Sequence, residues 1–534
     1  MCLGFLTLPL ILRKQTMQVS HHAALAFVAA ASFCWPGFAA EPDGPTALST
    51  QTESLRVSVE DRLQASPPSR KAERDALFKY YAAPDWALLW VDQNGVTTLG
   101  KAVIAEIGKA DDYGLRASDY SLPNTDDFKP NDITAVDWLA DAEIKISYAV
   151  LDYARDARGG RIDPQRISKD LDPTLALPDP YEVIQSISVR TDPATYLLSF
   201  QPQHPQFEAL RHKLIELRRD ANNGKKASVN KATIKTILVN MERWRWLPND
   251  LGPFYVNVNV PEFVVRVVDN GKVIHQAPVI VGKTNKPTPV FSDEMTEVVF
   301  NPVWNVPSSV KTEEILPWVM RSGGGGLFGG GWSTRIFEIN NLHVRYRGRE
   351  VDPRTIDWGR VDIRNLEIYQ PPGRGNVLGH VKFVFPNEHD VYMHDTTEKN
   401  YYGQPYRAVS HGCVRVQNPD QLALVILRHD QNWTQERVAS AFRGSGDNHV
   451  ALEQKIPVYI SYFTLRVNDD GSISTFRDIY GHDARMVAAL NGKNIGFNAP
   501  TNDKRVAATQ VKQGAKRDRR NRPANNFALT PFGF

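Results

Sequence analysis

The residues with the clearest potential for chemistry lie in the segment 410–415, which reads Ser-His-Gly-Cys-Val-Arg. Cys413 is the only cysteine of the 534-residue chain beyond position 34. The polar residues before Cys413, which include Gly412, can form a tight turn. The positive charge of Arg415 favours a thiolate. A structural, buried cysteine would more often lie among Val, Leu and Ala. Cys413 is therefore a candidate nucleophile.

A nucleophilic cysteine needs a base, and His394 is the best-placed candidate. It ends a strand-like pattern at residues 381–385 and 391–393, so a sheet could hold its imidazole rigidly. His380 borders that pattern and His429 follows an apolar run, which favours structural roles for both. We therefore expect His394 to exchange the proton of the thiol.

His389 lies in a polar turn, where we expect solvent around its ring. A metal site built from His389, Asp390 and His394 would fit no common ligand spacing. We therefore expect the chemistry to use neither a metal nor a cofactor.

The spacing of His394 and the segment Ser410–Cys413, with 15 residues between them, closely resembles the signature of L,D-transpeptidases with a YkuD-type catalytic domain. These bacterial cell-wall enzymes use a cysteine where penicillin-binding proteins use a serine. Other segments resemble the large periplasmic branch of the family, and they span residues 90–92, 113–115, 240–248, 301–307, 378–383 and 456–459. The resemblance extends over residues 75–482, roughly.

This resemblance implies acyl transfer on peptidoglycan stem peptides. His394 would take the proton of Cys413, and the thiolate would attack the carbonyl that joins the third and fourth residues of a stem. Backbone N–H groups around Gly412 and Cys413 would stabilise the oxyanion. The terminal D-amino acid would leave, and an amine would then resolve the thioester. That amine is typically the diaminopimelate side chain of a neighbouring stem, which gives a 3→3 cross-link.

Four further residues are candidates for binding the substrate. Arg415 would favour the thiolate or bind a substrate carboxylate, or it would form a salt bridge that holds the turn. Tyr392 would support the oxyanion region, or it would be a tyrosine of a core strand. Ser410 and His411 would shape the nucleophile turn or orient His394.

Three other functions remain open on the sequence. A hydrolase with the same Cys–His pair would trim stem peptides or cut cross-links as an L,D-carboxypeptidase or endopeptidase. The same thioester could attach an envelope protein to peptidoglycan. A non-catalytic wall-binding scaffold is disfavoured because His394, Gly412, Cys413 and Arg415 are intact. A papain-like protease is disfavoured because its cysteine precedes its histidine in the chain.

The elements that must position these residues change character along the chain. Runs with a helical period at 102–109, 143–157 and 207–219, divided by proline-rich breaks at 173–180 and 202–205, predict a helical scaffold. The period then changes to two, which predicts strands.

The strand pattern begins at residues 255–260 and 263–268 and ends at 458–467 and 472–476. Asp269-Asn270-Gly271 between β-rich runs predicts a hairpin. The expected fold class is α+β, with a helical scaffold before a mostly β YkuD-type catalytic domain. The expected segments are a signal peptide (1–40), a linker (41–70), the scaffold (71–247), the catalytic domain (248–482) with a capping insertion (about 310–377), and a basic disordered tail (483–534).

One feature departs from the architecture of the large branch. The large branch usually carries a small helical peptidoglycan-binding module after the helical arm, and the forty or so residues between Ser199 and Asn240 are too few for it. The capping insertion contains seven glycines in the ten residues 322–331, which predicts either a mobile lid hinge or a plain surface loop.

Composition restricts the function class further. The net charge of +3, from 63 basic and 60 acidic residues, excludes a surface built throughout for nucleic acid. Three cysteines exclude a disulfide scaffold. The mean hydropathy of −0.37 argues against a polytopic membrane protein.

Both ends of the chain carry expectations about location. An alanine-rich apolar run that ends in small residues before Glu41 predicts export to the periplasm, with Met17 as the possible true start and an uncleaved anchor as the alternative. Residues 503–522 carry eight basic side chains against two acids, so this tail could contact anionic envelope components weakly or be simply solvated. We expect a monomer.

Overall fold

The computed structural model describes residues 47–83, 86–222, 227–321, 332–493 and 495. The chain divides into two compact units, Met1–Glu53 and Ser54–Phe534, and the features below belong to the second. No helix in the described ranges is long and apolar enough to cross a membrane. The expected signal peptide, the glycine run 322–331 and the basic segment 503–522 lie outside the described residues.

The first half of the described chain is helical, as the sequence predicts. Several of its helices begin at a proline that follows an aspartate, and Asp163, Asp179 and Asp192 each accept a hydrogen bond from the first turn of the helix they precede. The helices are α1 (Ala47–Gln64), α2 (Lys71–Tyr81), α3 (Thr98–Ile107), α4 (Ala135–Gly159), α5 (Pro164–Ile167), α6 (Pro180–Ser188), α7 (Pro193–Leu198), α8 (Pro205–Asn222) and α9 (Ala227–Trp244).

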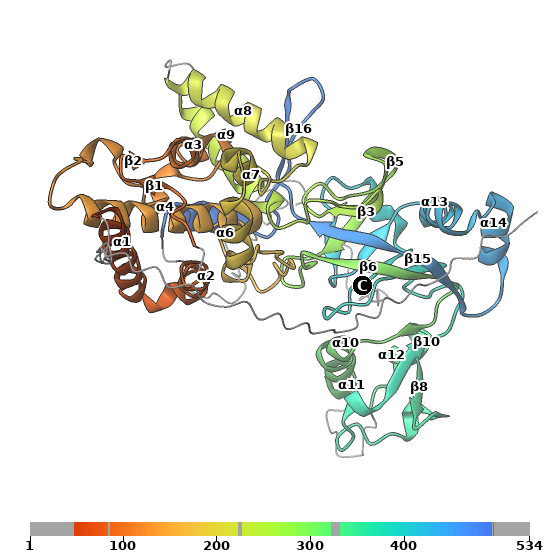
Figure 1. Ribbon diagram of the computed structural model, residues 1–534. Coiled ribbons are helices and arrows are strands. Elements are labelled where there is room, and N and C mark those ends of the chain that lie inside the picture. The colour runs from red at the N-terminus through yellow and green to blue at the C-terminus, as the bar shows by residue number, and fades with distance from the viewer. Residues whose placement is uncertain (1–46, 84–85, 223–226, 322–331, 494, 496–534) are drawn as a thin grey trace, which may run out of the picture. The chain divides into compact units, whose positions relative to one another are not determined.

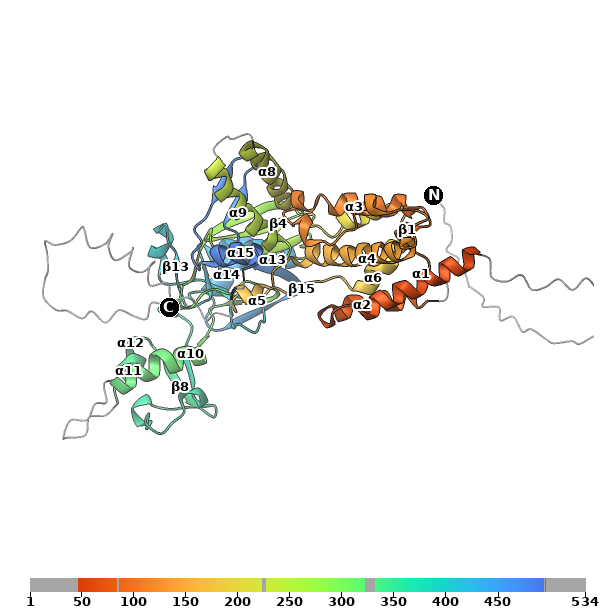
Figure 2. The ribbon, with the colours of Figure 1, turned by 90° about the vertical axis from the view of Figure 1, so that its left-hand side faces the viewer.

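Helix α4 is the centre of this helical scaffold. Its residues are buried along most of its length, and it contacts α2, α3, α6 and α7 (Figure 2). It also packs beside the short hairpin of β1 (Val91–Asp92) and β2 (Gly95–Val96). The buried Glu143 of α4 accepts hydrogen bonds from the backbone N–H groups of Leu89 and Trp90, at 2.7 and 2.9 Å.

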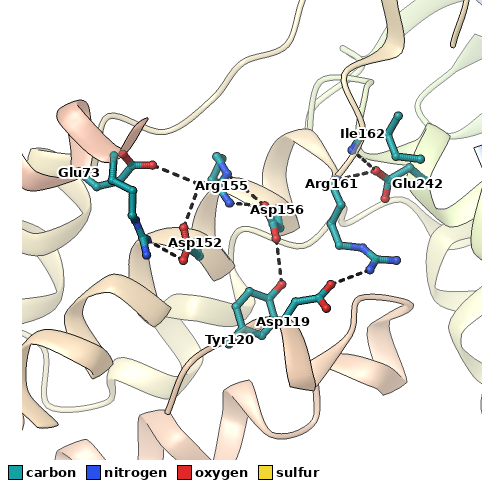
Figure 3. A network of polar contacts seen from close by, with 10 residues as sticks. Glu73, Asp119, Tyr120, Asp152, Arg155, Asp156, Arg161, Ile162 and Glu242 are labelled. Atoms are coloured by element: carbon teal, nitrogen blue, oxygen red, sulfur yellow. Dashed lines mark hydrogen bonds and ion pairs between the residues drawn. The ribbon is translucent and has the colours of Figure 1, made fainter. Parts of the chain in front are cut away.

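A chain of polar contacts runs from α4 toward α9 (Figure 3). Arg155 lies between Glu73 and Asp156, at 3.1 and 3.0 Å, and Asp156 accepts a hydrogen bond from the Tyr120 hydroxyl. Beyond it, the buried Glu242 of α9 accepts a 2.8 Å hydrogen bond from the backbone N–H of Ile162. The segment that leads into the catalytic domain is therefore fixed to the scaffold by polar contacts as well as by apolar packing.

The linker expected over residues 41–70 is a wrong prediction for most of its length. Helix α1 covers residues 47–64, and Leu55, Val59 and Leu63 are buried in the scaffold core. These three side chains recur every fourth residue and so share one face of the helix. The segment was predicted as a linker because the residues between these three are mostly polar.

The second half is built on a sheet of nine strands in the order β13-β5-β14-β12-β11-β6-β15-β3-β4. Strand β5 also pairs with β4, so the sheet closes on itself. Asn270 and Gly271 both have positive φ between β4 and β5, which confirms the predicted hairpin. The strands are β3 (Phe254–Asn259), β4 (Val264–Asp269), β5 (Lys272–Gly282), β6 (Phe291–Phe300), β11 (Val381–Val384), β12 (Met393–His394), β13 (Ala408–Ser410), β14 (Val414–Val416) and β15 (Asn448–Ser461).

Helices α13 (Pro419–Gln431), α14 (Gln435–Arg443) and α15 (His482–Leu490) contribute apolar side chains to the same core. The expected boundary at residue 483, where the tail was predicted to begin, is also wrong, because this residue lies inside helix α15. Met486 and Leu490 are buried against the sheet core. Strands β16 (Leu465–Val467) and β17 (Ile473–Thr475) form a separate hairpin, and β16 packs against α8 and α9.

The segment expected as a capping insertion has a sheet and a core of its own (Figure 1). Its strands lie in the order β7-β10-β8-β9, and its buried residues include Trp304, Ile315 and Trp358. Its elements are β7 (Trp304–Asn305), α10 (Ser308–Val310), a π-helical turn (Lys311–Ile315), α11 (Leu316–Arg321), α12 (Arg335–Ile339), β8 (His343–Tyr346), β9 (Arg349–Glu350) and β10 (Glu367–Gln370). We call this segment the cap.

Residues 205–244, where a peptidoglycan-binding module would have to fit, form α8 and α9 in the part that the structure describes. The two helices pack on each other and on β16.

Candidate active site

Strands β12 and β14 bring the two predicted catalytic residues onto one face of the sheet. They pair in parallel, with Met393 opposite Val414 and His394 opposite Arg415. The N–H of Val414 donates to the carbonyl of Tyr392 at 3.1 Å. Because side chains alternate along a strand, the side chains of His394 and Arg415 point away from the core in which Met393 and Val414 are buried.

The same alternation adds three side chains to this face. Tyr392 precedes Met393, and Cys413 precedes Val414, so both lie on the side of His394. Lys382 of β11 is the antiparallel partner of His394 and shares that side. We call these five residues, Lys382, Tyr392, His394, Cys413 and Arg415, the reactive face.

Cys413 is partly exposed, and its sulfur lies 3.8 Å from the carbonyl oxygen of Asp390. Burial of the sulfur raises the pKa of the Cys413 thiol above its ordinary value. The pKa of the thiol is lowered in part by hydrogen bonds from Tyr392 and by the positive charges of Lys382 and Arg415, but it remains raised overall. The charge of Arg415 thus acts toward the thiolate, and burial acts more strongly toward the neutral thiol.

His394 is 5% exposed, and its pKa is lowered to about 3. Burial is the largest cause, and the charges of Arg415 and Lys382 add to it. The imidazole is therefore neutral at any physiological pH and is able to accept a proton. Its Nδ1 atom is buried and has no hydrogen-bond partner among the described residues.

Ser410 shapes the nucleophile turn. Its hydroxyl donates to the carbonyl of Cys413 at 2.6 Å and accepts the N–H of Gly412 at 3.2 Å. Gly412 adopts φ 118°, which favours glycine, and its carbonyl accepts a 2.7 Å hydrogen bond from Thr288. The N–H of Gly412 is thus already bonded, which counts against its expected role as an oxyanion donor.

Arg415 is 1% exposed and forms an ion pair with Glu398 at 2.6 Å. Of the uses expected for it, the structure contains the salt bridge that holds the turn. Its charge nevertheless acts on the pKa values of both His394 and Cys413.

His411 reaches the cap. Its Nε2 atom lies 3.1 Å from the Lys283 ammonium and contacts the Glu314 carboxylate of the cap. Burial acts to raise the pKa of Glu314, but the hydrogen bond and charge of His411 hold it below its ordinary value. His411 therefore links the nucleophile turn to the cap.

Tyr392 also links the cap to the reactive face. Trp304 of β7 hydrogen-bonds to the Tyr392 hydroxyl, and that hydroxyl hydrogen-bonds to Cys413. Burial raises the pKa of Tyr392 well above its ordinary value, so the phenol keeps its proton. Tyr392 is partly exposed and directly precedes β12, so it lies beside the core strand and not within it.

Sequence reasoning missed four residues of this region: Lys382, Glu398, Trp304 and Thr288. Lys382 had a visible signal, because it is the one charged residue in the strand pattern Val-Lys-Phe-Val at 381–384. Trp304 lies within the segment 301–307 that carries part of the family resemblance. Glu398 and Thr288 reach the site from loops distant in sequence, and nothing in their local pattern indicates it.

The histidines expected to be structural or solvated lie outside the reactive face. His389 pairs with Asp172 at 3.1 Å, and the ring of His429 stacks on Phe254. His380 donates its backbone N–H to Asp395. Within the described ranges, no three His, Cys, Asp or Glu side chains are arranged to hold a metal ion.

Comparison with known proteins identifies two domains in the chain. Residues 75–214 match the family model of the scaffold domain, and residues 253–431 match that of the L,D-transpeptidase catalytic domain, YkuD. A curated protein of Haemophilus influenzae, whose name assigns it provisionally to the L,D-transpeptidases, is 29% identical over 256 residues. The match covers 48% of this chain and 50% of that protein, so the chain spans about half the length of the curated relative it matches.

Similar solved structures include an L,D-transpeptidase from Mycobacterium smegmatis and L,D-transpeptidase 1 from Mycobacterium tuberculosis, each 14% identical to this chain. Each match covers 39% of this chain, with 58% and 60% of the respective structures and TM-scores of 0.17 and 0.15. Scores this low support no argument about the fold, and the assignment rests on the matched domains. The chain belongs to the L,D-transpeptidase family, with a scaffold domain followed by a YkuD catalytic domain.

Proposed function

We propose that this protein is a peptidoglycan L,D-transpeptidase that forms 3→3 cross-links through a thioester on Cys413. The observation that carries the proposal is the pairing of β12 with β14, which sets a neutral imidazole and a thiol on one face of the sheet. A neutral imidazole that accepts the proton of the thiol is one of the means by which a cysteine nucleophile is activated.

In the first half-reaction, His394 takes the proton of Cys413 as the sulfur attacks the carbonyl between the third and fourth stem residues. The oxyanion that forms needs donors, and the N–H of Cys413 and the hydroxyl of Tyr392 are the groups we assign to it. The imidazolium then gives its proton to the departing amine of the terminal D-amino acid, and the C–N bond breaks. The acyl group remains on the sulfur as a thioester.

The low pKa of His394 suits this second proton transfer. An imidazolium with a pKa of about 3 is a stronger acid than an ordinary one, so it protonates the leaving amine readily. In the second half-reaction an acceptor amine attacks the thioester, His394 takes the proton of the amine, and the sulfur leaves and is reprotonated. A water molecule in place of the amine would give hydrolysis, so the acceptor alone separates a transferase from a carboxypeptidase.

The test uses purified tetrapeptide muropeptides as both donor and acceptor, with products resolved by mass spectrometry. We expect 3→3 linked dimers and release of the terminal D-amino acid, and we expect no product with Cys413→Ala. Trimmed monomers alone, with acceptor in excess, would instead establish the carboxypeptidase activity. A carbapenem should give a stoichiometric mass adduct that Cys413→Ala lacks, and absence of that adduct would favour the non-catalytic scaffold.

We also propose that the protein acts in the periplasm, as the N-terminal segment indicates. The measurement is cell fractionation of the tagged full chain. Recovery with cytoplasmic markers would contradict the assignment.

A further inference from the structure

Lys382 is a member of the reactive face that the mechanism above does not use. It lies on β11 directly opposite His394, and its neighbour on the other side is Val299 of β6. The ammonium lies 4.1 Å from the centroid of the Tyr392 ring, within the range of a cation–π interaction. The side chain is half-buried, which makes a free positive charge costly.

The charge of Lys382 is not neutralised by an ion pair among the described residues. The carboxylates that act on it from a distance are Glu297, Asp390 and Asp447. Two of them, Glu297 and Asp447, are already paired with His449, at 2.9 and 3.3 Å.

Among the groups that favour the charged form of this ammonium, Cys413 has the largest effect. Burial lowers the pKa of Lys382, and the strongest influence that raises it again is the charge of Cys413. The relation is mutual, because the charge of Lys382 lowers the pKa of the Cys413 thiol.

Arg415 is the other cation of the reactive face, and it differs from Lys382 in one respect. Its guanidinium is held by Glu398, so part of its field is cancelled. Tyr392 connects the ammonium to the sulfur, because its ring lies against Lys382 and its hydroxyl bonds to Cys413.

We propose that Lys382 is a positioning residue for the nucleophile, whose ammonium, held on the Tyr392 ring, stabilises the negative charge that develops on the sulfur of Cys413. The inference rests on the proposed function, in which Cys413 is the nucleophile. The proton of the thiol goes to His394, and Lys382 keeps its own proton throughout. No bond to Lys382 forms or breaks.

The test measures the thiol without any substrate. The full chain carries Cys2→Ser and Cys34→Ser, so that iodoacetamide can alkylate only Cys413, and mass spectrometry follows alkylation as a function of pH. Lys382→Met removes the charge at similar length. We expect its profile to move to higher pH, with alkylation near neutral pH slower by about tenfold, the effect of one unit in the pKa of the thiol.

Two further variants separate charge from structure. Lys382→Arg keeps the cation, and we expect it to restore most of the alkylation rate. Lys455→Met removes an exposed cation that pairs with Glu294, and we expect it to leave the profile unchanged. Thermal unfolding of each variant confirms that the fold is retained.

An unchanged profile in a folded Lys382→Met chain would overturn the inference. If that variant instead raised KM for the muropeptide and left alkylation unchanged, Lys382 would bind a substrate carboxylate, which also overturns it. Failure of the proposed function has a different signature. A chain whose alkylation depends on Lys382 but which forms no cross-link would refute the transpeptidase and leave the inference standing.

Discussion

His394 and Arg415 are register partners in β12 and β14, and the buried guanidinium adds to the burial that lowers the pKa of the imidazole. Burial and this guanidinium together keep the imidazole neutral, as the role of general base proposed for it requires. The base therefore remains functional in acid, at the cost of a weaker affinity for the proton that it must accept from Cys413.

The first prediction concerns the pH dependence of acylation. The pKa of His394 is about 3, so the imidazole stays neutral down to pH 5, and acylation by a carbapenem at pH 5 should stay within about threefold of that at pH 7. A histidine with an ordinary pKa near 6.5 would lose about 20-fold over the same interval. The measurement is the rate of adduct formation by mass spectrometry. An inflection near pH 6.5 that disappears in His394→Gln would contradict the assignment.

A second prediction concerns the hydroxyl of Ser410, which is bonded to both sides of the nucleophile turn. In Ser410→Ala the buried Gly412 N–H and the Cys413 carbonyl both lose a partner, at a cost of about 1–3 kcal/mol in stability. Displacement of the sulfur should lower the acylation rate by about 10- to 100-fold. Ser410→Thr keeps a hydroxyl and should recover most of the rate. Equal losses in the two variants would mean that the hydroxyl is not what holds the turn.

A third prediction concerns the contact between His411 and Glu314, which ties the nucleophile turn to the cap. Glu314→Gln keeps the shape of the side chain and removes its charge. We expect faster amide hydrogen exchange in residues 308–321 and a lower turnover rate, because the cap would detach more often.

The adjacent Glu313 supplies the control for that experiment. It pairs with Lys286, but its side chain is 54% exposed, and exposed pairs contribute little. Glu313→Gln should therefore change exchange and turnover less than Glu314→Gln. A larger effect of Glu313→Gln would show that the exposed pair of Glu313 and Lys286 holds the cap.

The sequence predicted the features whose signals are local. The change from a helical period to a strand period, the Asn270-Gly271 hairpin, and the spacing of His394 and Cys413 are all readable over short stretches, and the structure contains the predicted hairpin. Helix α1 was missed because a stripe of one apolar residue in four is hard to distinguish from a polar linker.

The parts of the site that were not predicted depend on register and on distant loops. Which side chains share a face with Cys413 follows from the pairing of β11, β12 and β14, and pairing is set by tertiary packing. Glu398 was missed because an ion pair across a loop has no periodic signal. The raised pKa of the thiol could not be foreseen, since it comes from burial.

The last prediction concerns Gly379, in the turn that leads into β11. Its φ is +61°, and a Cβ there would overlap the carboxylate of Asp395, which itself accepts the backbone N–H of His380 at 3.0 Å. Gly348 has a φ of +76° with open space around it. Substitution of Gly348 therefore measures only the cost of placing a side chain on a left-handed backbone. Gly348→Ala should lower the free energy of unfolding by about 1–2 kcal/mol, the cost of a left-handed conformation.

Gly379→Ala should cost about 1–3 kcal/mol more than Gly348→Ala, because the carboxylate must move to admit the methyl group. Asp395 directly follows His394, so acylation should slow in Gly379→Ala and remain normal in Gly348→Ala. The measurements are denaturant unfolding and carbapenem adduct formation on both variants. Equal stability losses would mean that Asp395 yields freely, and a normal acylation rate in Gly379→Ala would mean that the position of His394 does not depend on this turn.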